Sequence, residues 1–196
     1  MEGPFRAFLD ASVLYPVTLR NLLMRLALNG LFQAHWSKHV HEEWIRAVLR
    51  DRPDIPVERL HAVRDAMNEH AEESLVNGYE GLIEALYLPD IDDRHVLAAA
   101  IVGHADVIVT HNVRDFPQQL LERYGIEAQH PDEFVRHLPG LAPTLVVDAL
   151  RDQQTALTRP PMTMEEVLEL LERIGLVETV AELRRVLRGP GQTSRM

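Results

Sequence analysis

Short apolar runs alternate with longer amphipathic segments through the first two thirds of the chain. The runs have the length and β-branched content of buried strands, and the segments between them repeat apolar residues at helical spacing. The predicted strands are 6–10, 31–36, 106–110 and 126–128. The predicted helices are 18–29, the segment after Ser37, 56–70, 94–102 and 117–124, with mainly helical structure over 72–88. This alternation predicts an α/β fold, a parallel sheet flanked by helices.

The pattern changes after Leu138-Pro139-Gly140, beyond which no strand signal is present. Pro143 suits the first turn of a helix that runs to about Ala156. Thr163 and Glu166 form a capping-box pattern ahead of the next helix, and 177–187 completes a helical hairpin. The predicted division is a domain over 1–139, a helical extension over 140–188 and a disordered tail over 189–196.

Composition limits the classes of protein to consider. The chain has 196 residues, no cysteine and a formal net charge of −10. Without cysteine there is no disulfide framework and no thiolate nucleophile. No apolar run is long enough to span a bilayer and no secretory signal opens the chain, so we expect a cytoplasmic protein without membrane contact. The negative charge argues weakly against non-specific nucleic-acid binding, although 36–64 holds a local basic strip.

Acidic side chains stand where an open parallel sheet places its ligands, beyond the carboxyl ends of the strands. Asp10 ends the first predicted strand, and Asp115 follows the strand that ends at Thr110. Asp93 begins a helix and Glu43 lies within one. Carboxylates that converge on one point repel one another unless a cation is present, and Mg²⁺ or Mn²⁺ prefers oxygen ligands. Such a set can activate water against a phosphodiester.

Each acid taken alone also has a simpler explanation. Asp93 suits a helix N-cap, and Asp90 and Asp92 are typical turn residues. Glu43 is compatible with a solvated helix face, and Asp115 with loop structure. The indication of a site comes from the whole set and not from one residue.

The same segments resemble the motifs of the PIN-domain family. Residues 8–14, Phe-Leu-Asp-Ala-Ser-Val-Leu, are similar to the opening of that family, and Ser37 with Glu43 resembles its second segment. The third segment is matched by 89–100, which begins Pro-Asp-Ile-Asp-Asp-Arg, and the closing motif by 109–116, Val-Thr-His-Asn-Val-Arg-Asp-Phe. The resemblance covers 6–135 in the order and spacing of the family.

The resemblance implies a Rossmann-like sheet, cleavage of RNA with Mg²⁺ or Mn²⁺, and a homodimer. Chains of this size in the family are often VapC-type toxins neutralised by a small antitoxin protein, and here a C-terminal helical segment is added. The implied catalytic and metal-binding residues are Asp10, Glu43, Asp93 and Asp115, with Asp90 or Asp92 as further ligands. The implied supporting residues are Ser12, Thr110 and Asn112.

Arginines near these motifs are candidate substrate contacts: Arg46, Arg50, Arg94 and Arg114. Trp36 and Trp44 could stack on bases, but their aliphatic surroundings favour core packing. Two other functions stay open. One is a DNA nuclease or phosphatase that uses the same metal site, and the other is a binding module without catalysis.

Overall fold

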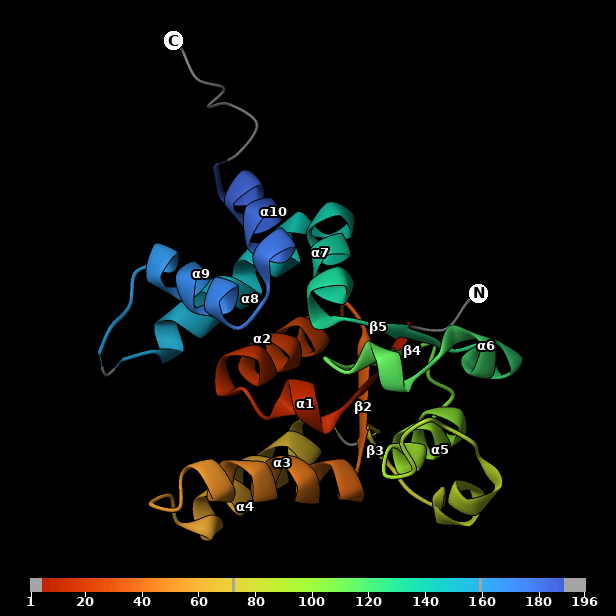
Figure 1. The fold of residues 1–196 in the computed structure, drawn as a ribbon. Coiled ribbons are helices and arrows are strands. Elements are labelled where there is room, and N and C mark those ends of the chain that lie inside the picture. The colour runs from red at the N-terminus through yellow and green to blue at the C-terminus, as the bar shows by residue number, and fades with distance from the viewer. Residues whose placement is uncertain (1–4, 72, 159, 189–196) are drawn as a thin grey trace.

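A five-stranded parallel sheet forms the centre of the computed structural model, which describes residues 5–71, 73–158 and 160–188 (Figure 1). The strand order is β3-β2-β1-β4-β5, and every neighbouring pair is parallel. The strands are β1 (Arg6–Leu9), β2 (Gln33–Ser37), β3 (Leu75–Val76), β4 (Val107–Val109) and β5 (Glu127–Gln129). The predicted α/β fold class is therefore confirmed.

Helices connect the strands and cover the sheet. The α-helices of this part are α1 (Ala11–Leu14), α2 (Val17–Leu28), α3 (Lys38–Asp51), α4 (Val57–His70), α5 (Arg94–Val102) and α6 (Gln118–Leu121), and the 3₁₀ turns are η1 (Glu80–Ala85), η2 (Val113–Asp115) and η3 (Glu122–Tyr124). α2 and α5 pack against the sheet from opposite sides (Figure 1). β1 lies at the point where the strand order reverses, between β2 and β4. In doubly wound sheets this position is the usual ligand site.

α5 lies close to the sheet because its side chains are small. Ala98, Ala99 and Ala100 are all completely buried. At its C-cap, a Cβ on Gly103 would stand 2.8 Å from Cγ2 of Val76 and 3.1 Å from Nδ1 of His35. The absence of a side chain at Gly103 thus allows the C-terminal end of α5 to approach β2 and β3.

Both tryptophans belong to the core, as predicted. Trp36 and Trp44 have no exposed surface. The Trp36 indole Nε1 donates to Oδ1 of Asn68 at 2.8 Å, and the Trp44 indole donates to Nδ1 of His41 at 2.9 Å. Since both polar atoms are satisfied inside the core, these rings anchor α3 to β2 and α4 and are not free to stack on bases.

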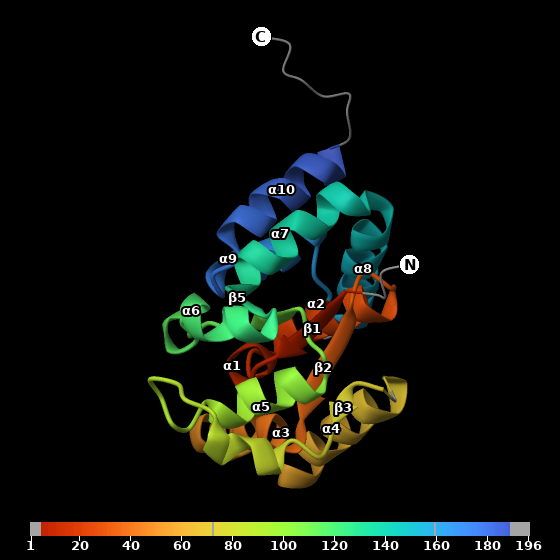
Figure 2. The same ribbon diagram turned by 90° about the vertical axis from the view of Figure 1, so that its right-hand side faces the viewer.

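Four further helices follow the sheet: α7 (Pro131–Leu141), α8 (Pro143–Ala156), α9 (Met164–Arg173) and α10 (Val177–Arg188). They lie together above the sheet in Figure 2, where α7 and α10 run side by side. α8 packs along α2, and the Gln153 amide donates to the carbonyl of Thr18 at 3.1 Å. Val146 and Leu150 of α8 are part of the same buried cluster as the strands. The extension therefore shares one hydrophobic core with the sheet.

One local prediction is wrong, one helix was missed and one boundary falls inside a helix. The segment 72–88 was predicted to be mainly helical, but its described residues, 73–88, contain β3 and the 3₁₀ turn η1. The helix α7 was not predicted, and it runs through the predicted boundary after position 139. The predicted disordered tail, 189–196, lies outside the described residues. Within the described ranges, no helix is long and apolar enough to cross a membrane.

The shared core makes a stability prediction. Leu150 is completely buried between α8 and its neighbours, so Leu150→Ala should lower the free energy of unfolding by about 2–5 kcal/mol. Leu141→Ala is the matched control because Leu141 is 81% exposed, and its effect should stay within about 0.5 kcal/mol. Urea unfolding followed by tryptophan fluorescence measures both. A Leu150→Ala protein whose tryptophan transition is unchanged would show that the helices unfold separately from the sheet.

Candidate active site

Asp10 is held at the carboxyl end of β1 by a network of donors. Its backbone N–H donates to the carbonyl of Val109 at 3.1 Å, which joins it to β4. Its carboxylate Oδ2 accepts from the hydroxyls of Ser12 and Thr110, each at 2.7 Å, and Oδ1 accepts from the backbone N–H of Ala11 at 2.7 Å. Asp10 is only 5% exposed. Three hydrogen bonds fix the direction of this buried carboxylate.

The loop after β4 is tied to the same group. The Ser12 hydroxyl accepts from the backbone N–H of His111 at 3.1 Å, and the Thr110 hydroxyl accepts from the backbone N–H of Asn112 at 3.0 Å. Ser12 and Thr110 therefore each bond to Asp10 on one side and to the loop on the other. The predicted supporting residues Ser12 and Thr110 meet at Asp10, whereas Asn112 contributes a backbone N–H and its side chain is exposed.

Asp93 stands at the N-cap position of α5, yet its side chain makes no capping hydrogen bond. Its carboxyl is half-buried, and burial raises its pKa from an ordinary value of 3.8 to about 7, with further contributions from the charges of Asp10, Asp90, Asp115 and Glu43. The simpler explanation as a helix cap is thus not what the structure shows. The negative charges of the other acids act together on Asp93.

Glu43 of α3 reaches the same region through a histidine. Its Oε1 lies 2.8 Å from Nε2 of His95, a residue of α5 that is 8% exposed. The hydrogen bond joins α3 to α5 across 52 positions of sequence and sets the direction of the Glu43 carboxylate. The contact was not predicted, because no local sequence pattern marks a pair so far apart.

The remaining predicted acids occupy the edges of the region. Asp115 ends the turn η2, where its backbone N–H donates to the carbonyl of Asn112 at 2.9 Å. Asp90 is exposed and its Oδ1 accepts from the backbone N–H of Asp92 at 2.9 Å, a turn contact. Asp90 and Asp115 still act on Asp93 through their charge. Asp92 is exposed and is not among the charges that shift Asp93.

The donor set suits a hard divalent cation in chemistry, because all its members are carboxylate or hydroxyl oxygens. Among the described residues, no three acidic or histidine side chains lie close enough together to hold one ion. The carboxylates are thus close enough to act on one another through their charges, but their oxygens do not surround a single point as metal ligands would. Burial is the main cause of the raised pKa of Asp93, and repulsion from the neighbouring acids, which a bound cation would relieve, adds to it.

Two known protein families match parts of the chain. Residues 6–114 match the family model described as PIN domain, and 131–185 match the one described as VapC50 C-terminal domain. The chain belongs to the PIN-domain family. The PIN match spans more than half of the chain and includes Asp10, Glu43 and Asp93, and it ends one residue before Asp115. The second match begins with α7, so the chain is a VapC-type PIN protein with a C-terminal extension.

One similar protein is the "Putative ribonuclease VapC50" of Mycobacterium tuberculosis (strain ATCC 25618 / H37Rv). It is 38% identical over 94 residues, which cover 48% of this chain and 55% of the relative. The chain therefore matches only about half the length of that protein. No solved structure matches the chain.

The four predicted arginines differ in exposure. Arg46, Arg50 and Arg114 are exposed, and Arg50 already pairs with Asp51 at 3.1 Å. Arg94, next to Asp93 in sequence, is half-buried, and its buried Nε has no hydrogen-bond partner among the described residues.

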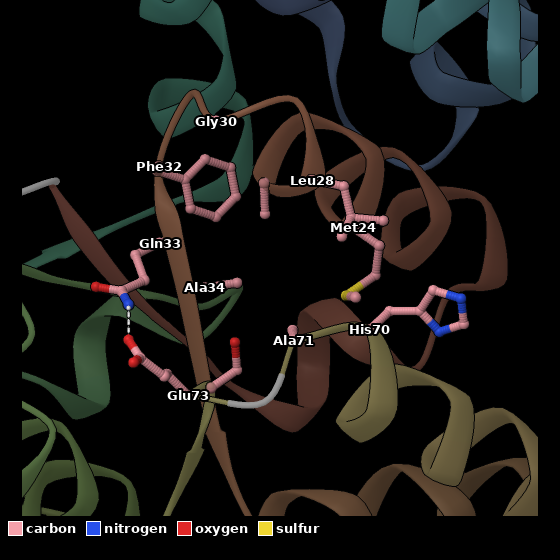
Figure 3. A pocket seen from close by; sticks show the side chains of 11 residues that line it. Met24, Leu28, Gly30, Phe32, Gln33, Ala34, His70, Ala71 and Glu73 are labelled. Atoms are coloured by element: carbon pink, nitrogen blue, oxygen red, sulfur yellow. Dashed lines mark hydrogen bonds between the residues drawn. The ribbon is translucent and has the colours of Figure 1, made fainter.

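A large pocket lies elsewhere on the PIN domain. It has a volume of about 400 Å³ and is bounded by α2, β2 and the end of α4 (Figure 3). Met24, Leu28 and Phe32 line it, and a hydrogen bond of 3.3 Å from Gln33 to Glu73 lies at one side (Figure 3). It contains none of the predicted site residues and is near the amino end of β2, away from Asp10. We therefore assign it no part in the chemistry of the acids.

The raised pKa of Asp93 makes a testable prediction for metal-free protein. The carboxyl keeps its proton in the folded state up to about pH 7, whereas in the unfolded state it loses it near pH 3.8. Folding therefore takes up a proton between these values, and stability falls as the pH rises through them. Asp93→Asn removes this penalty, so in EDTA it should unfold at a higher urea concentration than the parent at about pH 8, with a gain that vanishes at about pH 4.

Asp92→Asn is the control, because Asp92 neighbours Asp93 in sequence but is exposed. Its difference from the parent should not change with pH in this way. Equal stability of the Asp93→Asn protein and its parent at the higher pH would show that the acids do not converge on Asp93.

Proposed function

We propose that the chain is a metal-dependent endoribonuclease and the toxin of a type II toxin–antitoxin pair. The observation that carries the proposal is the convergence of acidic charge on Asp93 at the switch point of a PIN-domain sheet. Asp10, Glu43, Asp93 and Asp115 would hold Mg²⁺ or Mn²⁺, with Asp90 as a further ligand. Asp92 has the weakest support because it does not act on Asp93.

A bound divalent cation would supply an activated water and neutralise the charge that develops on the phosphodiester. The residues of the chain serve that chemistry in distinct ways. Ser12 and Thr110 fix the Asp10 carboxylate, and His95 fixes that of Glu43. Arg94, next to Asp93 in sequence, would bind a phosphate oxygen through its guanidinium. Asp93, with its pKa of about 7, can hold a proton near neutral pH until a cation displaces it.

RNA as substrate and a toxin role come from the similar protein, whose name is that of a ribonuclease, and from the match of the extension to the VapC50 C-terminal domain. We extend both to this chain together with a small antitoxin partner, a homodimer and a cytoplasmic location. A DNA nuclease or phosphatase with the same acids would differ in substrate alone. A silent binding module would leave the convergence of charge on Asp93 without a use.

Cleavage of RNA by purified protein tests the proposal. With Mn²⁺ or Mg²⁺ the parent should cut a mixed RNA pool, and EDTA should stop the reaction. Asp10→Asn should reduce the rate by more than the roughly 10–100-fold lost with outer-shell partners of metal ligands, because it removes a ligand charge. Single-stranded DNA, duplex DNA and a phosphate monoester belong in the same panel.

Asp152→Asn is the matched control, since Asp152 is an exposed residue of α8 far along the chain from the acids. It should cut at the parental rate. RNA cleavage that survives EDTA or is equal in the Asp10→Asn protein would refute the metal site, and a preference for DNA or the monoester would replace the substrate class.

The toxin role predicts an effect on growing cells. Induced production of the parent chain in a bacterial host should arrest growth, and co-production of the small protein encoded beside it should restore growth. The Asp10→Asn chain, made at the same level, should not arrest growth, because arrest depends on cleavage. Equal arrest by both chains would favour the silent binding module, whose effect does not need the acids.

A further inference from the structure

Two histidines join the site loop to the C-terminal helices. Nδ1 of His111, the residue after Thr110, lies 3.0 Å from Nε2 of His130, the residue before α7. Their ring centroids are 4.9 Å apart at an interplanar angle of 69°, so the rings meet by their edges. Both side chains are half-buried. The contact links the loop after β4 to the first helix of the extension.

The contacts of His130 determine which nitrogen carries its proton. His130 is the N-cap of α7, and its Nδ1 accepts from the backbone N–H of Asp132 at 3.2 Å. An accepting Nδ1 carries no proton, so in the neutral ring the proton is on Nε2. His130 therefore donates from Nε2 to Nδ1 of His111, and the proton of His111 is on its own Nε2. Burial and the neighbouring His130 lower the pKa of His111, which favours this neutral pair.

Each end of the pair continues into further hydrogen bonds. On one side, the backbone N–H of His111 donates to Ser12 Oγ at 3.1 Å, and that hydroxyl donates to Asp10 at 2.7 Å. On the other side, the carboxylate of Asp132 accepts from the backbone N–H groups of Glu178 and Thr179 at 3.0 and 2.7 Å. The first turn of α10 is thus connected to the Asp10 carboxylate through α7 and the histidine pair.

We propose that His130 is a positioning residue: it anchors the site loop 110–112 to the C-terminal helices and so keeps the Ser12 and Thr110 hydroxyls on Asp10. The consequence for catalysis rests on the proposed ribonuclease function, whereas the anchoring of the loop does not. The extension then has a definite role, to order one wall of the site, apart from any surface it offers to a partner.

His130→Asn separates the anchor from the helix cap. Asparagine is a favourable N-cap, so its side-chain oxygen can still accept from the backbone N–H of Asp132, but it lacks the ring that reaches His111. His137→Asn is the matched control, the same substitution at an exposed position of α7. Both proteins should unfold at similar urea concentrations.

Amide hydrogen exchange of residues 110–112 in metal-free, full-length protein is the first measurement. It should be faster in the His130→Asn protein than in the His137→Asn protein. In the parent, ¹⁵N shifts of the imidazoles should show an unprotonated Nδ1 and a protonated Nε2 for both His111 and His130. Equal exchange in the two variants, or a proton on Nδ1 of His130, would overturn the proposal.

Cleavage of RNA is the second measurement. In His130→Asn, kcat should fall about 10-fold, the lower end of what outer-shell partners contribute, while KM stays near that of His137→Asn. An unchanged kcat together with faster exchange would overturn the catalytic consequence. If the parent does not cleave RNA at all, the proposed function fails, and the exchange and ¹⁵N measurements still decide whether His130 anchors the loop.

Discussion

At the carboxyl end of β1, acidic side chains lie partly buried and close enough to repel one another. Asp10 follows β1, the central strand. Asp93 stands at the start of α5, which covers one face of the sheet, and Glu43 lies on α3, the helix that follows β2. Burial raises the pKa of Asp93 to about 7, and the charges of these acids, with those of Asp90 and Asp115, add to the shift. Hydrogen bonds hold two of the other acids in place. Hydroxyls and a backbone N–H stabilise Asp10, and His95 stabilises Glu43.

Those contacts explain why the fold is built as it is near the site. The close approach of α5, which Gly103 and the buried alanines permit, brings Asp93 and His95 to the end of β1. The Thr110 hydroxyl, directly after β4, reaches the neighbouring Asp10 because parallel strands end at the same edge. The acidic surroundings of Asp93 therefore depend on the packing of α5 and on the register of the β1–β4 pair. A cation among these oxygens would relieve the repulsion.

Much of this could be predicted from sequence where the signal is local. The helices 94–102 and 143–156 have the predicted bounds, because periodicity and capping residues mark them. β3 was missed because a strand of two residues shows no alternation. α7 was missed because Pro139 and Gly140 are unfavourable in helices, and packing against α10 and α8 stabilises the helix in the fold. The family motifs predicted which acids to consider. They could not predict the His95–Glu43 or His111–His130 contacts, because partners 52 and 19 positions apart are brought together by the fold alone.

The extension and the PIN domain share one hydrophobic core, so the structure of the site depends on the whole chain and not only on the acids. We propose that these acids share one cation, and anomalous diffraction at the manganese edge, from crystals of the full chain grown with Mn²⁺, would locate it. One peak is expected within about 2.0–2.6 Å of oxygens of Asp10 and Asp93, the distance range of hard divalent cations. A well-occupied peak elsewhere with none among the acids, or no peak at saturating Mn²⁺, would contradict the proposal.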